Sequence, residues 1–227
     1  WGRPDAYGHS SVSTSDDATL AYREGAFDDT IYWVDRSGRK TTELAFTGRH
    51  DGANLSPDGR RLAACSGGPN ILGGTLSVLD LDRGTRTNLT SDPAMGCSGP
   101  RWSRDGSDVF YRSTKDAKIE LRRRAVSSGK EHVLFAPAEG FAAWNDVSPD
   151  GRSALMVVVH PKTNFDLWLI PLSGDSKPQP LLVSAYAEGD ARFSPDGRYV
   201  AYVSNETGRS EVYLRRFPVT DEKWAVS

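Results

Sequence analysis

The chain has 227 residues, of which 37% are hydrophobic and 26% charged, and its formal net charge is −2. This balance excludes intrinsic disorder, which needs few apolar residues and a strong net charge. It also argues against a general nucleic-acid binder, because 28 Lys and Arg residues against 30 Asp and Glu residues leave no surplus of positive charge to neutralise phosphates. No apolar run approaches the roughly 20 residues that cross a bilayer, so we expect no membrane span in this chain.

One short motif recurs along the chain at nearly constant spacing. It reads Ser-Pro-Asp-Gly-Arg at 56–60, 148–152 and 194–198, and Ser-Arg-Asp-Gly-Ser at 103–107. A degraded copy at 13–18 has Asp17 in place of the glycine. The glycine-equivalent positions are 17, 59, 106, 151 and 197, so successive copies are 42, 47, 45 and 46 residues apart. A period of 40 to 50 residues is typical of propeller blades, each of which is a four-stranded sheet.

Each copy therefore predicts one four-stranded blade, with the motif in the turn that follows the first strand. The five predicted blades are residues 8–46, 50–90, 97–136, 142–184 and 188–227. The strands expected after the turn are 20–22, 30–34 and 41–45; 62–65, 75–81 and 85–89; 109–112, 119–124 and 132–135; 154–159, 165–170 and 180–183; 199–203, 211–217 and 224–226. Residues 191–194 are expected as the first strand of the last blade. No segment shows sustained 3.6-residue apolar periodicity, so helix should be nearly absent.

The residue types of the motif explain why it forms a turn. Proline presets φ, aspartate bonds to nearby backbone, and glycine adopts a positive φ. The predicted turn residues are Asp58, Gly59, Asp105, Gly106, Asp150, Gly151, Asp196 and Gly197. None of these aspartates lies in the Asp-x-Asp-x-Asp-Gly pattern of a calcium loop. We therefore expect structural turns here, and no metal or cofactor site is predicted anywhere in the chain.

The motif copies, each followed by an apolar strand, resemble the TolB-type, or WD40-like (PD40), propeller repeat of bacteria. A narrower resemblance, over 33–38, 80–85, 167–175 and 193–217, is to the C-terminal sensor-like propellers of large bacterial serine/threonine protein kinases. It implies an all-β propeller of which five blades are present, within a ring of six or more, and an extracytoplasmic, periplasmic location. The chain has no His-Arg-Asp loop and no Gly-rich loop before a lysine-bearing strand, so it carries no kinase catalytic domain.

A set of polar residues is expected on one face of the propeller. Antiparallel strands alternate in direction, so the segments leading into first strands lie on the same face as those joining second to third strands. The residues in these segments are His9, His50, Asp51, Trp144, His160, Glu188 and Asp190. A polar set with an aromatic residue at the mouth of the axial channel predicts a binding site for a ligand or a peptide. Solvated surface loops would have the same composition, so both interpretations stay open.

The function expected from these features is a non-catalytic binding or sensor module that recognises a protein segment or a small molecule. The chain has no Gly-x-Ser-x-Gly elbow, and the glycine-rich stretch 67–74 lacks the ending of a phosphate-binding loop. Two alternatives are open. The chain could be the substrate-gating propeller of a prolyl-oligopeptidase-like serine peptidase, or a propeller lyase or lactonase using His50, Asp51 and His160.

The two cysteines and the two end blades lead to further expectations. Cys65 ends the second strand of its blade and Cys97 leads into the first strand of the next, so both should lie on the same face. This placement leaves a disulfide open, but a disulfide needs Cα atoms within about 7 Å, which the sequence does not establish, and we expect two buried or isolated thiols instead. In an incomplete ring the end blades expose apolar faces, which predicts dimerisation, aggregation or a closed five-blade ring.

Overall fold

The computed structural model describes the chain in segments. The residues described are 12–14, 20–24, 30–35, 37–44, 50–67, 74–92, 94–137, 140–160, 162–172, 177–218 and 222–227. They form β-strands and turns, and no helix occurs among them. In this described part there is accordingly no helix long and apolar enough to cross a membrane.

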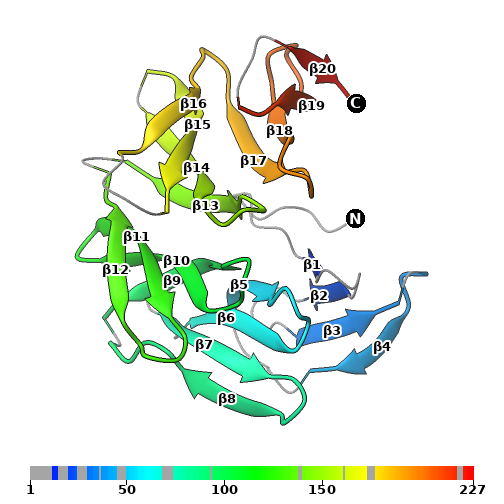
Figure 1. Cartoon of the computed structure of the whole chain (residues 1–227), viewed down its shortest axis with the longest axis vertical. Helices are drawn as coiled ribbons and strands as arrows, with labels where there is room; N and C mark the ends of the chain where they lie inside the picture. Colours follow the sequence, from blue (N-terminus) through cyan, green and yellow to red (C-terminus); the bar gives the residue numbers. More distant parts are fainter. Residues whose placement is uncertain are drawn as a thin grey trace. The chain divides into compact units, whose positions relative to one another are not determined.

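The strands form five four-stranded sheets, in each of which every strand lies beside the next one in sequence (Figure 1). The first sheet contains β1 (Val12–Thr14), β2 (Leu20–Glu24), β3 (Thr30–Val34) and β4 (Lys40–Glu43). The second contains β5 (His50–Leu55), β6 (Arg61–Gly67), β7 (Gly74–Asp80) and β8 (Thr85–Asn88). The third contains β9 (Gly96–Trp102), β10 (Asp108–Lys115), β11 (Lys118–Ala125) and β12 (Glu131–Phe135). The fourth contains β13 (Ala142–Val147), β14 (Ser153–His160), β15 (Asn164–Pro171) and β16 (Gln179–Leu182). The fifth contains β17 (Glu188–Phe193), β18 (Tyr199–Ser204), β19 (Glu211–Arg216) and β20 (Lys223–Ala225). The sequence prediction of five four-stranded blades is confirmed.

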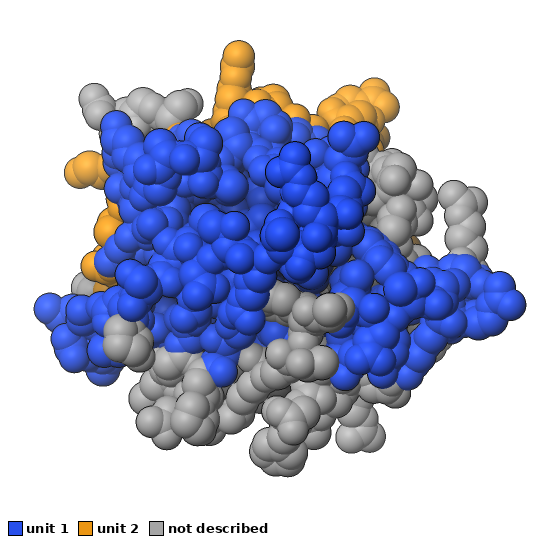
Figure 2. Space-filling model, turned by 90° about the horizontal axis from the view of Figure 1, so that it is seen from below, with its two compact units in different colours: residues 1–118, 122–132 blue, residues 119–121, 133–227 orange. Residues whose placement is uncertain are grey.

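The chain divides into two compact units (Figure 2). Unit 1 comprises residues 1–118 and 122–132, and unit 2 comprises residues 119–121 and 133–227. In unit 1 the strands β5, β6 and β7 all contact β9, and in unit 2 the strands β13, β14 and β15 all contact β17. The first strand of one sheet thus packs on the face of the preceding sheet in both units, as in neighbouring propeller blades.

This packing explains why the inner strands are apolar on both faces. In β6, Ala63 and Cys65 belong to one buried cluster, whereas Leu62 and Ala64 belong to another. Successive side chains of a strand point to opposite faces, so a sheet covered on both sides needs apolar residues at every position. The unbroken apolar run 62–65 follows from this requirement.

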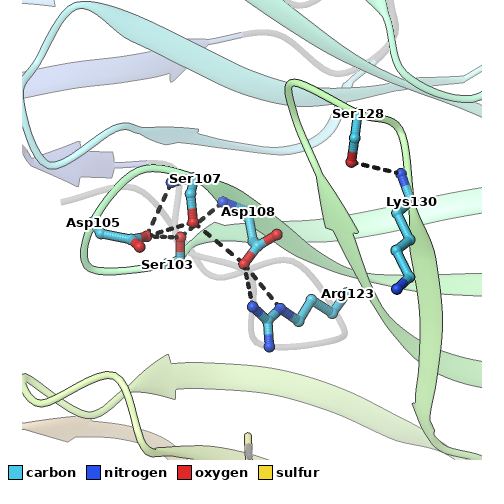
Figure 3. A network of polar contacts seen from close by, with 7 residues as sticks. All are labelled: Ser103, Asp105, Ser107, Asp108, Arg123, Ser128 and Lys130. Atoms are coloured by element: carbon cyan, nitrogen blue, oxygen red, sulfur yellow. Dashed lines mark hydrogen bonds and ion pairs between the residues drawn. The ribbon is translucent and has the colours of Figure 1, made fainter.

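All four motif turns have the same hydrogen-bond network. The serine hydroxyl donates to the aspartate Oδ1 over 2.5 to 2.7 Å and accepts from the backbone N–H five residues after the serine. The aspartate Oδ1 also accepts from the backbone N–H two residues after itself. The motif glycines have φ between 68° and 69°. Figure 3 shows the third-sheet copy, in which Ser103, Asp105 and Ser107 form this network beside Asp108.

These contacts account for the low pKa values of the turn aspartates. The serine hydrogen bond is the largest cause, and it lowers the pKa of Asp105 to about 2. The same hydrogen bond lowers the pKa values of Asp58, Asp150 and Asp196. The hydrogen bonds within each turn thus engage the aspartate carboxylates, as expected for structural turns.

The basic run in β11 is divided between the two faces of its sheet. Arg122 and Arg124 both pair with Glu131, whereas Arg123 pairs with Asp108 (Figure 3). The three arginines therefore form no common basic surface.

The first strands of the second to fifth sheets share a feature that the sequence analysis did not predict. Each of them contains one extra residue relative to its partner strand, so the register shifts within β5, β9, β13 and β17. Gly52, Gly99 and Asp190 occupy equivalent places, seven residues before the motif glycine, with φ of 92°, 56° and 51°. Such a bulge bends the strand and lets pairing continue beyond it, which is why β17 begins at Glu188 rather than at residue 191.

The cysteine prediction was wrong. Cys65 and Cys97 form a disulfide bond, with Cα atoms 5.4 Å apart. The reason is that β6 packs directly on β9, which brings the end of one strand to the start of the other. Strand order alone places the cysteines in neighbouring sheets, but the distance between them depends on how closely those sheets pack.

Candidate functional site

The residues predicted to bind a ligand are distributed over both units. His50 and Asp51 lie on β5 in unit 1, and Trp144, His160, Glu188 and Asp190 lie on β13, β14 and β17 in unit 2. His9 and the side chain of Asp51 lie outside the described residues. The binding role of this set stays a prediction, and the geometry has to be considered unit by unit.

Three of these residues have clear structural surroundings. His50 is 3% exposed and pairs in register with Ser66, and Trp144 is 3% exposed and pairs with Met156. Asp190 is exposed and occupies the bulge of β17, where its φ of 51° is of the kind that aspartate tolerates better than most residues. The backbone conformation of the bulge therefore explains why an aspartate stands at position 190.

In unit 2 the strand ends are arranged as the topology argument requires. Glu188 at the start of β17 pairs with Ser204 at the end of β18, which in turn pairs with Glu211 at the start of β19. In the neighbouring sheet, His160 at the end of β14 pairs with Asn164 at the start of β15. The strand β15, which begins at Asn164, contacts β17, which begins at Glu188.

Glu188 is the most unusual of these groups. Its side chain is almost completely buried, with 4% of the residue exposed. The Ser184 hydroxyl donates to its Oε1 over 2.6 Å, whereas its Oε2 is buried without a hydrogen-bond partner. Burial is the largest cause and raises the pKa of Glu188; the Ser184 hydrogen bond, the second cause, lowers it, and the negative charges of Asp166 and Glu206 raise it again, so that the net direction is upward.

Asp166 is a second buried carboxylate in the same region, and the sequence analysis missed it. It is 2% exposed, and the Thr163 hydroxyl donates to its Oδ2 over 2.6 Å. Thr163 Oγ1 lies 3.3 Å from Nδ1 of His160, so the predicted residue His160 is linked to Asp166 through one hydroxyl. Oδ1 of Asp166 is buried without a partner. A signal was present in the sequence, because Asp166 is an acidic residue within the otherwise apolar strand 165–170.

Ser204 completes the group. It is 1% exposed, its Oγ has no hydrogen-bond partner, and it lies directly across from Glu188 in the paired strand. We call Asp166, Glu188 and Ser204 the strand-end acidic cluster. It combines two buried carboxylates and one buried hydroxyl, and one oxygen of each finds no hydrogen-bond partner within the described part of the chain.

The strand-end acidic cluster can accept hydrogen bonds from a positively charged partner. Buried acceptors that lack a partner are costly and therefore uncommon in native proteins. Among the described residues, no group of three or more His, Cys, Asp or Glu side chains is arranged to hold a metal ion.

The comparisons with known proteins bear on the fold. A TolB protein from Agrobacterium tumefaciens superimposes with a TM-score of 0.78 at 22% identity, covering 96% of this chain and 79% of that one. TolB from Acinetobacter baumannii gives 0.73 at 20% identity, covering 91% of this chain and 51% of that one. The chain has the TolB-type β-propeller fold. A prolyl endopeptidase also matches, with a TM-score of 0.68 at 15% identity over 96% of this chain and 36% of that one.

In the sequence comparisons, no protein-family model matches this TolB-type chain. A tricorn protease homologue from Streptomyces coelicolor is 47% identical over 49 residues, which is 22% of this chain and 4% of that protein. The matched segment is thus a small part of the relative, and the likeness to the solved structures, at 15 to 22% identity, concerns the fold.

Proposed function

We propose that the chain is a non-catalytic binding module of the sensor type, and that its ligand binds at the strand-end acidic cluster of unit 2. The observation that carries the proposal is the pair of buried carboxylate oxygens without a partner, Oδ1 of Asp166 and Oε2 of Glu188. A buried charged acceptor without a partner costs at least about 1 to 3 kcal/mol, which a ligand that donates hydrogen bonds would recover.

The arrangement supports this proposal in two further ways. The cluster lies where strands of two packed sheets end, so its geometry is fixed by rigid elements, as binding sites generally require. The other oxygens of the two carboxylates are held by Thr163 and Ser184, so the carboxylates are already oriented before a ligand arrives.

An extracytoplasmic location belongs to the same proposal. The Cys65–Cys97 disulfide supports it, because structural disulfides persist in oxidising compartments and are rare in the cytosol. Mass spectrometry after alkylation of the denatured, unreduced protein tests this part: both cysteines should escape alkylation although denaturation exposes them.

The proposal is tested by a two-dimensional ¹H–¹⁵N NMR screen of the chain against a defined library of metabolites, saccharides and short peptides. The expected result is at least one compound that shifts the amide signals of Thr163, Asp166, Glu188 and Ser204 and is recovered unchanged after prolonged incubation. Binding only at residues remote from these four, or chemical conversion of the bound compound, would contradict a non-catalytic binding site here.

A further inference from the structure

The strand-end acidic cluster has a specific pattern of free acceptors. The atoms without partners are Oδ1 of Asp166, Oε2 of Glu188 and Oγ of Ser204. We propose that these three residues bind a primary ammonium group, presented by a lysine side chain or by the amino terminus of a protein segment. This inference rests on the proposed binding function and names the chemistry of the ligand.

The number of free acceptors matches an ammonium group. A primary ammonium has three N–H donors and no acceptor, so it can donate once to each of the three oxygens. Two of these hydrogen bonds would join a cation to a carboxylate, which makes them roughly twice as strong as bonds between neutral groups.

The same geometry disfavours a guanidinium group. Arginine frequently recognises a carboxylate through two parallel N–H···O bonds, and this bidentate mode uses both oxygens of that carboxylate. Here one oxygen of each carboxylate already accepts from a hydroxyl of this chain, Thr163 for Asp166 and Ser184 for Glu188. The fork of an arginine would therefore meet one free oxygen per carboxylate.

A divalent cation also fits less well. Calcium takes six to eight oxygen ligands and magnesium requires near-octahedral coordination, whereas the cluster offers three free oxygens. The nearby carboxylate of Glu206 is already paired, since both of its oxygens lie 2.7 Å from Nζ of Lys223. Within the described part of the chain, no third carboxylate, histidine or cysteine completes a metal site at this place.

A protein segment is favoured as the source of the ammonium. Tyr186 lies in the segment that joins β16 to β17, between Ser184 and Glu188, and it is 44% exposed. An exposed aromatic ring of this kind offers apolar contact to the residues on either side of a bound lysine, and tyrosine is enriched at protein interfaces.

The experiment is an NMR titration with two matched probes. Nα-acetyl-lysine methylamide carries the ammonium, and Nα-acetyl-norleucine methylamide has a neutral side chain of similar length. We expect saturable shifts of the Asp166, Glu188 and Ser204 amides with the lysine probe alone. Glu188→Gln should weaken binding about tenfold or more, since a hydrogen bond to a charged group is worth at least about 1.5 kcal/mol. Glu222→Gln is the control, because it removes an exposed carboxylate of unit 2 that pairs with Arg216.

Further probes separate the alternatives. Alanine methylamide, which presents a free α-amino group, shows whether the amino terminus or the lysine side chain is preferred. Equal or tighter binding of Nα-acetyl-arginine methylamide, or saturation by Ca²⁺, Mg²⁺ or Mn²⁺ alone, would overturn the ammonium assignment. If the lysine probe fails while another compound of the screen binds at these residues, the ammonium inference fails and the binding function stands. If neither experiment detects a ligand, the binding function and the ammonium inference both fail.

Ser204→Ala is the second variant. It removes only one hydroxyl and should weaken lysine binding about threefold or more.

Discussion

The side chain of Asp146 joins two packed sheets of unit 2, and its removal is the sharpest test of how the sheets are held together. Its Oδ2 accepts from the backbone N–H of Phe193 over 2.9 Å, and its Oδ1 accepts from the N–H of Val147 over 2.9 Å. Asn54 has the equivalent role in unit 1, where its Oδ1 accepts from the N–H of Trp102 over 3.1 Å. Both residues stand five positions before their motif glycine.

The expected cost of Asp146→Ala follows from these contacts. Phe193 is 9% exposed, so its N–H has little water to replace the lost acceptor. A hydrogen bond to a charged group contributes about 1.5 to 3 kcal/mol, and we expect Asp146→Ala to lower the free energy of unfolding by about 2 kcal/mol. For a chain of this size that corresponds to a fall in Tm of about 4 to 8 °C. Asn54→Ala removes a neutral acceptor and should cost about 1 kcal/mol.

Urea denaturation of the two variants, together with amide hydrogen exchange of Phe193, provides the assay. Asp146→Asn is the matched control, because it keeps an acceptor oxygen and should cost less than about 1 kcal/mol. A loss below about 0.5 kcal/mol for Asp146→Ala, with unchanged exchange of the Phe193 amide, would refute the claim that this hydrogen bond holds the sheets together.

Three more predictions concern single features of the fold. The Cys65–Cys97 disulfide joins residues 32 positions apart, and its reduction should lower the free energy of unfolding by about 3 to 4 kcal/mol. Urea denaturation with and without reductant measures this loss, and an unchanged midpoint would contradict the disulfide. Asp190→Val should destabilise the folded chain by more than about 1 kcal/mol, because a β-branched residue is strained at a φ of 51°, whereas Asp190→Gly should not. Thermal unfolding of both variants tests this, and equal Tm values would contradict the bulge geometry. The folded-state pKa of Glu188 is raised, so its contribution is fully favourable below its unfolded pKa and is lost as pH rises through the folded pKa. Glu188→Gln should therefore gain stability relative to the parent chain as pH rises from 4 to 7, and a constant difference across this range would show that burial does not disfavour the charge.

Most of the fold could be predicted from the sequence because propeller blades are local structures. Each blade contains consecutive strands joined by short turns, and the chemistry of the Ser-Pro-Asp-Gly-Arg turn is complete within six residues. The strand bulges could not be predicted in the same way. The positive φ values at Gly52 and Gly99 belong to these bulges, and in the sequence the bulges appear only as glycines seven residues before the motif glycine.

The candidate site was accessible to sequence reasoning only in part. Topology alone placed Glu188 and His160 at one end of their sheets, because strand direction alternates within a blade. It did not identify Asp166 or Ser204, since the burial of both depends on which face of a strand packs on the neighbouring sheet. The disulfide was missed for the same reason: the sequence gives the order of the sheets along the chain, and only their packing gives the distance between them.

The most direct test of the account is a crystal structure of the chain soaked with Nα-acetyl-lysine methylamide. The account predicts density for the ammonium nitrogen within hydrogen-bond distance of Oδ1 of Asp166, Oε2 of Glu188 and Oγ of Ser204. Density that shows no probe, with these three oxygens hydrogen-bonded to other groups of the chain itself, would contradict the account.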